Sequence, residues 1–539
     1  MSLKKIKHLI FSPNALIKAV SNRLGIPSRS LKAFLNHNKR LWKDFRCPSA
    51  KSLILFDYYP MAETELVRTY FLNVHAKKFN AKIVSYSINK NIRSRIWDKV
   101  YRSLNVENHL TMRLSRKQKI EVKHKYLEIK SQLLTKDDLF NLKLEGVWIG
   151  VDIYEEYLMR YIEPTVNMDD KRINKVIKDG IEIFVFFRDF FRQNDVKLID
   201  SSHIGVRLKS NLVPKIAGQL FNIPYYSSHI RTMIFYPEPH KYIDEEVRKY
   251  KTYHENFKKF THSEQQSAVR WGKERLELRL SGKVGVDMSY SSASAYNSNL
   301  ASGQVTKTTK NLKVLVCSHE FYDSPNCIGG LLFLDFYEWM LYLGKISKES
   351  NYDWYIKTHP DVTPKTEKII KKFVDDHDNF SLIPPSTSFQ QLRKEGVRHI
   401  LTCHGSMGHE CPLLGMTVIN SANNYHMGYD FNINAKTLEE YEHIISNLDK
   451  VNKTIDPKEI YEFYYMHNNI YQQISDDWFF GSYLDYLDKV APEERGGFKV
   501  FEYHLKNFSK AKHLKIISLM NDFIDSGARG IATKQIINV

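Results

Sequence analysis

Residues 354–360 read Trp-Tyr-Ile-Lys-Thr-His-Pro, and residues 400–410 read Ile-Leu-Thr-Cys-His-Gly-Ser-Met-Gly-His-Glu. Each stretch is a short apolar run that ends in a small polar cluster, and a helix-like segment separates the two. The pattern predicts two strands of a parallel sheet whose polar ends face one crevice, because ligands of open α/β sheets bind at the carboxyl ends of the strands. The stretch therefore predicts a nucleotide or nucleotide-sugar site.

Strand-like and helix-like segments alternate on both sides of this stretch. From Leu312 to Ile419 the alternation predicts a doubly wound α/β domain, and residues 51–86 predict a βαβ unit of an earlier one. Residues 287–310 are rich in Ser, Ala, Asn and Thr and lack an apolar period, so they predict a linker.

The sequence therefore predicts five parts. They are a basic helical segment at 1–50, a first Rossmann-like acceptor domain at 51–286, the linker at 287–310, a second Rossmann-like nucleotide-sugar domain at 311–454, and a helical region at 455–539 that packs across both domains. The fold class expected is α/β with two doubly wound domains.

Composition favours a globular protein with an anionic partner. The chain has 539 residues, 42% of them hydrophobic, and a formal net charge of +18. Residues 1–46 alone carry eleven Lys and Arg side chains and one acid. No nucleic-acid signature with interleaved aromatics is present, so an anionic membrane surface is preferred over nucleic acid. An ordinary solvated basic surface is the alternative.

The location expected is the cytoplasm, with peripheral attachment to a membrane surface. No apolar run approaches the roughly 20 residues that span a bilayer, and residues 9–11 are too short for the core of a signal peptide. Five cysteines, at no metal-ligand spacing, indicate free thiols in a reducing compartment.

Two polar clusters supply the candidate donor-binding residues. His359 at a strand end can donate to a phosphate, Pro360 fixes the turn, and Lys357 precedes them. In the second cluster the glycines permit close backbone approach, Ser406 can cap a helix and contact phosphate, and Glu410 can accept from a ribose. The candidates there are His404, Gly405, Ser406, Met407 and Glu410. A plain turn and a plain helix cap are the alternatives.

Two further segments carry candidates. Ser318, His319 and Asp323 follow the first strand of the second domain and are candidates for substrate contact, unless this loop is only solvated. Glycosyl transfer needs a base for the acceptor hydroxyl, for which Glu155 is the first choice and Asp152 the second. A charged helix face is the alternative. No third ligand accompanies the histidines of residues 404–409, so no metal is expected.

These residues resemble bacterial capsule and surface-polysaccharide biosynthesis proteins, including the Kdo transferases of capsule assembly and, more distantly, the GT-B sialyltransferases. Residues 356–360 resemble a Lys-Pro-His-Pro motif with Thr358 in place of the first Pro. Residues 404–410 resemble a His-Gly-Thr/Ser-x-x-x-Glu motif, and residues 150–158 resemble a Gly-x-x-Ile-Tyr-Asp-x-Tyr-Leu pattern. Glu155 stands where that pattern has Asp, which puts its role as a base in question.

The resemblance implies a GT-B fold with a cleft between two domains, and metal-independent transfer from a nucleotide-sugar without a cofactor. The donor implied is a CMP-sugar of Kdo or another nonulosonic acid, with His359 as a catalytic residue at the leaving phosphate. The acceptor implied is a glycan or a lipid-linked glycan at the inner membrane. A GT-B-like sugar-nucleotide epimerase or hydrolase, and a non-catalytic scaffold of a polysaccharide assembly complex, remain the rivals.

Overall fold

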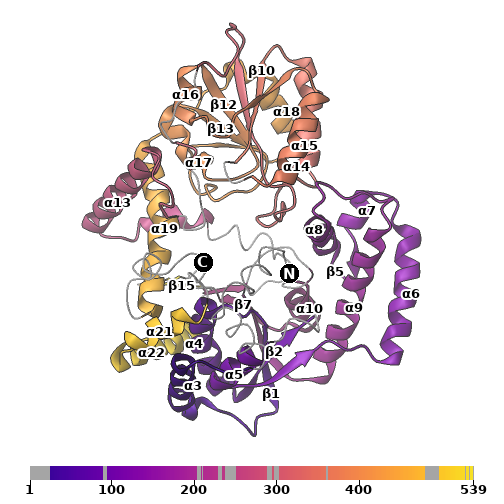
Figure 1. Ribbon diagram of the computed structural model, residues 1–539, viewed down its shortest axis with the longest axis vertical. Helices are drawn as coiled ribbons and strands as arrows, with labels where there is room; N and C mark the ends of the chain where they lie inside the picture. The colour runs from indigo at the N-terminus through magenta and orange to yellow at the C-terminus, as the bar shows by residue number, and fades with distance from the viewer. Residues whose placement is uncertain are drawn as a thin grey trace, which may run out of the picture.

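The structure is a computed structural model that describes residues 25–88, 94–202, 208, 211–228, 233–236, 250–287, 294–296, 303–359, 362–479, 497–527, 530–532 and 535–537. Its elements form two lobes, each built on one large sheet (Figure 1). The lower lobe in that view holds the N-terminal strands, and the upper lobe holds residues 313–434.

The first sheet has eight strands in the order β16-β15-β8-β7-β6-β1-β2-β3. Its parallel part runs through β1 (Ser52–Asp57), β2 (Ala81–Ser87), β3 (Val106–Thr111), β6 (Val196–Ser201) and β7 (Tyr225–Ser228). An antiparallel edge follows, made of β8 (Met233–Tyr236), β15 (Gly530–Ala532) and β16 (Gln535–Ile537). The order β3-β2-β1-β6-β7 reverses between β1 and β6, as in a Rossmann fold.

Alternating side chains of β1 feed the cores on the two faces of the first sheet. Ile54 and Phe56 pack with helices on one face, and Leu55 packs with helices on the other. The first group is α3 (Arg29–Leu41), α4 (Ala62–Phe79), α5 (Arg95–Ser103), α21 (Lys499–Lys506) and α22 (Lys510–Ser526). The second is α6 (Arg116–Gln132), α7 (Lys136–Phe140), α8 (Gly150–Tyr161), α9 (Arg172–Gln193) and α10 (Leu212–Phe221).

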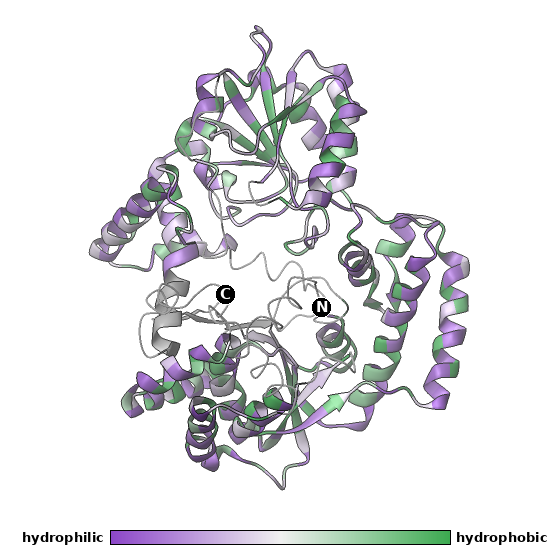
Figure 2. Cartoon of the chain, in the orientation of Figure 1, coloured by the Kyte–Doolittle hydropathy of each residue, from purple (hydrophilic) through white to green (hydrophobic). Residues whose placement is uncertain are grey.

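The second sheet has six parallel strands in the order β11-β10-β9-β12-β13-β14. They are β9 (Lys313–Cys317), β10 (Asp353–Lys357), β11 (Phe380–Ile383), β12 (Val397–Thr402), β13 (Thr417–Asn420) and β14 (Ile433–Asn434). Helices α14 (Phe336–Ile346), α15 (Pro364–Asp375) and α18 (Leu438–Ser446) cover one face, and α16 (Phe389–Lys394) covers the other. Figure 2 shows the apolar strands between helices whose outer faces are polar.

The predicted fold class is confirmed. The chain is α/β, with two Rossmann-like doubly wound sheets in a GT-B-like arrangement and helices after the second sheet. Helix α19 (Pro457–Phe479) runs from the upper lobe down to the lower lobe in Figure 1, where α21 and α22 pack.

Three features of the fold are not predicted by the sequence. Within the charged stretch 91–145, β3 adds an edge strand to the first sheet. The strand at residues 147–148 is short, and α8 begins at Gly150. The region at 455–539 is mostly helical as predicted, but it also contains β15 and β16, which return to the first sheet.

Residues before the expected linker pack with the second lobe. Helices α12 (Tyr253–Phe257) and α13 (His262–Leu280) share a core with residues 425–431 and with α19. The sequence places these helices in the first domain, because aromatic packing against a distant segment leaves no local signal. Residues 1–24 of the basic N-terminal segment lie outside the described residues.

Candidate functional site

The carboxyl ends of three neighbouring strands in the second sheet meet at one pocket. The residues that follow β9, β10 and β12 reach it, and the strand order reverses between β9 and β12. Six predicted site residues line it, namely Ser318, Lys357, His359, Ser406, Met407 and Glu410. The site thus lies at the topological switch point, where open α/β sheets bind their ligands.

Five polar residues of this pocket are not predicted by the sequence. Arg279 and Lys283 come from the end of α13 and the turn after it, and Ser294 and Tyr296 come from the segment expected to be a linker. Thr358 lies between two predicted residues. The one signal in the sequence is that two basic residues precede a Ser-rich segment. That signal does not predict that this segment packs beside the end of β10.

Lys357 places a buried cation at the pocket. Its side chain is fixed by a hydrogen bond from Nζ to the carbonyl of Pro385 at 2.8 Å, and Nζ lies 5.3 Å from the centre of the Phe389 ring. Burial lowers the pKa of this ammonium group. A buried cation with no carboxylate partner among the described residues favours an anionic ligand.

Two buried hydroxyl groups lie in the same lining. Ser318 and Thr358 are 6% and 3% exposed, and neither Ser318 Oγ nor Thr358 Oγ1 has a hydrogen-bond partner in the described part of the chain. Buried polar atoms without partners are costly unless a ligand or water satisfies them. These hydroxyls follow adjacent strands, since β9 pairs with β10, and they are suited to donate to a phosphate.

Glu410 is already held by three side chains. Its carboxylate is ion-paired with Arg279 and accepts from Tyr296 Oη at 2.6 Å and from Ser406 Oγ at 3.1 Å. The predicted capping role of Ser406 is therefore wrong, because its hydroxyl turns to Glu410 and makes no cap hydrogen bond to α17 (Met407–Glu410). α17 is short, since Pro412 starts a separate 3₁₀ turn.

His319 and His404 lie behind the pocket and do not line it. Nε2 of His319 accepts from the backbone N–H of Cys403 at 3.2 Å, and its ring stacks on Phe336 with centroids 4.5 Å apart. Burial lowers the pKa of His319 well below its usual value and that of His404 to about 4. Both rings are therefore neutral and position the turn that contains Gly405, whose φ of +136° suits glycine.

The remaining candidates of the second lobe have separate places. His359 is exposed at the rim of the pocket, and its backbone carbonyl accepts from Val362 N–H at 3.1 Å. Pro360 lies outside the described residues. Asp323 does not line the pocket, and its backbone N–H bonds to Glu320 O at 3.2 Å.

The two candidate bases are buried in packing roles. Glu155 is 1% exposed, and its Oε1 accepts from the backbone N–H and from Nδ2 of Asn326, both at 2.9 Å. Asp152 is fully buried and ion-paired with Lys215 Nζ at 2.6 Å. Neither lines the pocket, so the geometry gives both carboxylates a positioning role and does not favour proton abstraction by either.

A charged cluster occupies the switch point of the first sheet, and the sequence reasoning missed it. Arg68, on α4, is fully buried and pairs with Asp57 at the end of β1, with Asp200 in β6 at 2.7 Å and with Glu65 at 3.1 Å. Backbone and hydroxyl groups of residues 202 and 228 donate to the two aspartates. Arg68 thus ties together the strands where a ligand would bind in other sheets of this kind.

Burial shifts two of these carboxyl groups. It raises the pKa of Glu65 to about 8 and that of Asp200 to about 6, against the opposing effect of the Arg68 charge. Glu65 is therefore largely protonated at neutral pH. The Arg68 guanidinium then contacts three carboxyl groups, of which Glu65 carries little negative charge.

No group of three His, Cys, Asp or Glu side chains in the described ranges is placed to hold a metal ion. The five cysteines are free thiols. Among the helices that the structure describes, none combines the length and apolar character needed to cross a membrane.

Comparisons with known proteins give only weak likenesses. No protein-family model and no curated protein matches the sequence. KpsC, a β-Kdo 2,4 transferase of Thermosulfurimonas dismutans, aligns with 50% of this chain and 79% of its own, at 17% identity and a TM-score of 0.31. UDP-GlcNAc 2-epimerase of Neisseria meningitidis aligns with 86% and 99%, at 13% identity and a TM-score of 0.18. MurG of Acinetobacter baumannii aligns with 79% and 98%, at 9% identity and a TM-score of 0.21.

The strand order of the two sheets and the helices on their faces establish the fold independently of these likenesses.

Proposed function

We propose that the chain is a metal-independent glycosyltransferase that takes its sugar from a nucleotide-sugar. The main support is the buried cation of Lys357 beside the hydroxyls of Ser318 and Thr358, which have no hydrogen-bond partner in the described part of the chain. These groups lie at the switch point of the second sheet. These groups suit the phosphate of a nucleotide, whose negative charge increases as the sugar departs.

Each pocket residue has a distinct proposed role. Lys357 and the two hydroxyls bind the phosphate in the ground state and stabilise it as it leaves. His359, exposed at the rim, is the titratable group placed to touch the phosphate or the reacting atoms. Glu410 binds a ribose hydroxyl after Tyr296 withdraws from it. Glu155 and Asp152 hold α8 and act only through the residues they contact.

The pocket must widen before a whole nucleotide-sugar enters. Its cavity measures about 60 Å³, whereas small-molecule pockets measure roughly 300–1,000 Å³. Residues 283–285 and 294–296 line it from outside the second sheet. The proposal therefore includes withdrawal of these residues when the nucleotide binds.

The finer assignment is a CMP-linked donor of Kdo or another nonulosonic acid, with a glycan or lipid-linked acceptor at the anionic inner-membrane surface. It is supported by the sequence motifs at residues 356–360 and 404–410. Described residues of both motifs line the same pocket, and His319 bonds to the backbone just before the second motif. The net charge of +18 supports attachment to anionic lipid.

The deciding experiment is a thermal-shift screen with CMP, UDP, GDP and ADP. One nucleotide should raise the melting temperature, and Lys357→Met or His359→Ala should abolish the rise. Lys372→Met, on the exposed face of α15, is the control and should keep it. If no nucleotide shifts the wild-type protein, the pocket assignment is wrong.

Product analysis with the bound nucleotide's sugar then separates the rival functions. Transfer that depends on an acceptor supports the proposal. Rapid conversion of the donor alone supports an epimerase or hydrolase, and binding without turnover of any donor supports a scaffold.

A further inference from the structure

A second and larger cavity lies in the first lobe, away from the second sheet. It measures about 640 Å³, within the range of small-molecule sites. It opens after the carboxyl ends of β2 and β3 and is walled by α6, α9 and the last turn of α8. None of the sequence motifs and none of the pocket roles above involves this cavity.

The rim of this cavity is strongly basic. Arg113, Lys119, Lys123 and Lys178 line it, all are exposed, and none forms an ion pair with a carboxylate of the described chain. Four unpaired cations around one opening attract an anion.

The acids of the cavity do not cancel this charge. Asp179 is ion-paired with Arg160 at 2.5 Å, and Arg160 also binds Glu156 at 2.9 Å. Glu182 is the other acid, and burial followed by the charge of Asp179 raises its pKa, against the opposing charges of Lys178 and Lys119. The cavity keeps an excess of positive charge because five basic side chains line it and only these two acids do.

The floor of the cavity is apolar. Ile88, Met112 and Leu114 are partly exposed in its lining. They pack against the core under α9, to which the buried Val122, Ile183 and Leu208 belong. An inorganic anion would leave this apolar surface unused, whereas an alkyl or prenyl chain would cover it.

The outer face of α6 also combines basic and apolar side chains. Ile120 and Leu127 are 53% and 55% exposed and lie one heptad apart, hence on one face of the helix. Lys117, Lys123 and Lys130 flank them at helical spacing. A basic helix face with exposed aliphatic side chains suits the surface of anionic lipid.

We propose that this cavity binds an anionic amphiphile, in which a phosphate group contacts the basic rim and the apolar chain lies on the floor. Such a ligand is of the class expected for a lipid-linked acceptor. The proposal stands on the cavity alone and holds whether or not the second lobe transfers a sugar.

Calorimetric titration with three soluble ligands tests the proposal. Octyl phosphate, kept below its micelle concentration, carries both the anion and the chain, octyl glucoside carries only the chain, and inorganic phosphate carries only the anion. The wild-type protein should bind octyl phosphate about tenfold or more tightly than either partial ligand. No binding of octyl phosphate, or equal binding of a partial ligand, would overturn it.

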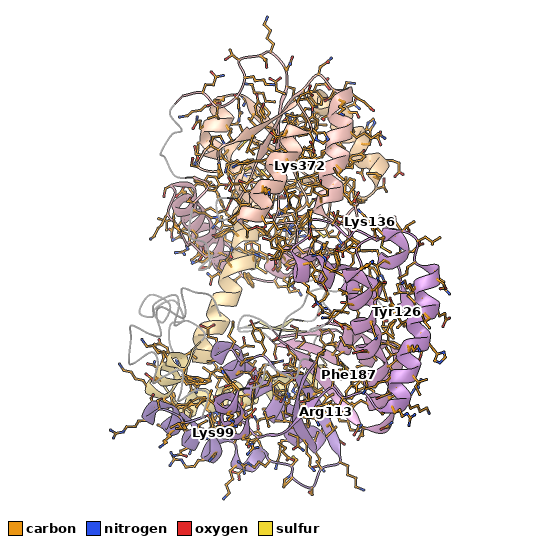
Figure 3. The ribbon with its side chains drawn as sticks, turned by 45° about the vertical axis from the view of Figure 1, so that its right-hand side comes forward. Lys99, Arg113, Tyr126, Lys136, Phe187 and Lys372 are labelled. Atoms are coloured by element: carbon orange, nitrogen blue, oxygen red, sulfur yellow. The ribbon has the colours of Figure 1, made fainter. Side chains whose placement is uncertain are left out.

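Charge reversal locates the site. Figure 3 shows Arg113 on the side of the lower lobe that carries Tyr126 of α6 and Phe187 of α9, while Lys99 and Lys372 lie elsewhere. Arg113→Glu with Lys123→Glu should weaken octyl phosphate binding about tenfold or more. Lys99→Glu with Lys372→Glu changes the net charge equally and should leave binding unchanged.

A third variant excludes binding at the second-lobe pocket. His359→Ala should bind octyl phosphate as the wild-type protein does. Equal losses in the two charge-reversed proteins, or a loss in His359→Ala, would contradict the assigned cavity. Melting curves of the unliganded variants show whether each is folded.

Discussion

The carboxylate of Glu155 on α8 holds Asn326 in the loop after β9, with Oε1 accepting both the backbone N–H and the side-chain amide at 2.9 Å. One turn of the same helix supplies Tyr154, whose hydroxyl donates to Asp335, the residue that caps α14. α8 therefore couples the first lobe to the loop and helix that follow β9 of the second sheet.

Glu155→Gln should retain catalytic turnover, because the amide oxygen can accept both hydrogen bonds that Oε1 now accepts. Glu155→Ala should lose about 1–3 kcal/mol of stability by leaving buried donors unpaired. Urea unfolding and turnover of the two variants test this. If Glu155→Gln folds with normal stability but loses turnover, the residue acts as the base after all.

Tyr296→Phe should strengthen nucleotide binding. Tyr296 Oη donates to Glu410 at 2.6 Å, which is the place proposed for a ribose hydroxyl. Removing one such hydrogen bond shifts the balance by about 0.5–1.5 kcal/mol, or roughly twofold to tenfold in Kd. Titration with the nucleotide identified by thermal shift measures the change, and Tyr355→Phe, whose hydroxyl accepts from Lys307 outside the pocket, is the control. Weaker binding by Tyr296→Phe would mean that the Tyr296 hydroxyl contacts the bound nucleotide, contrary to this prediction.

Glu65→Gln should remove a pH dependence of folding stability. The pKa of Glu65 is about 8 in the folded protein, against an ordinary 4.5. The folded state therefore binds more protons between these pH values, so its stability is complete below pH 4.5 and falls as the pH rises through 8. The Gln variant keeps the oxygen that accepts from Arg68 and from Tyr101, and it cannot ionise.

Between pH 6 and 8 the wild-type protein should lose roughly 1–3 kcal/mol relative to this variant. Asp200, whose pKa is about 6, contributes to the slope at lower pH in both proteins. Urea unfolding at several pH values measures the difference. Parallel stability curves for the two proteins would show that Glu65 is ionised in the folded state.

Arg68→Met should destabilise the protein by about 3–5 kcal/mol, because it leaves buried carboxylates without their counter-charge. Arg192→Met is the matched control. Arg192 is 55% exposed and pairs with Glu145 and Asp189 at 3.6 and 3.8 Å, so its loss should cost less than about 1 kcal/mol. Similar losses in the two variants would mean that the Arg68 cluster is dispensable for stability.

The sequence by itself determined the two doubly wound sheets. Strand runs such as Leu53–Phe56 and Val314–Cys317 alternate with amphipathic helices, and local patterning of this kind fixes both the elements and the edge where polar residues collect. It also predicted Lys357, His359 and Ser406 as residues of one site, because each lies at or after the carboxyl end of a strand of the same parallel sheet.

Only the tertiary structure decided what surrounds those residues. Arg279 and Tyr296 join the pocket through packing of α13 and its following segment against the second lobe, and Arg68 meets Asp200 across 132 positions of the chain. The tertiary structure also decided the surroundings of Glu155 and Asp152, because their partners Asn326 and Lys215 lie far away in the chain. Local periodicity sets which face of an element is apolar, but contacts between distant segments decide which polar groups are buried, paired or open to a ligand.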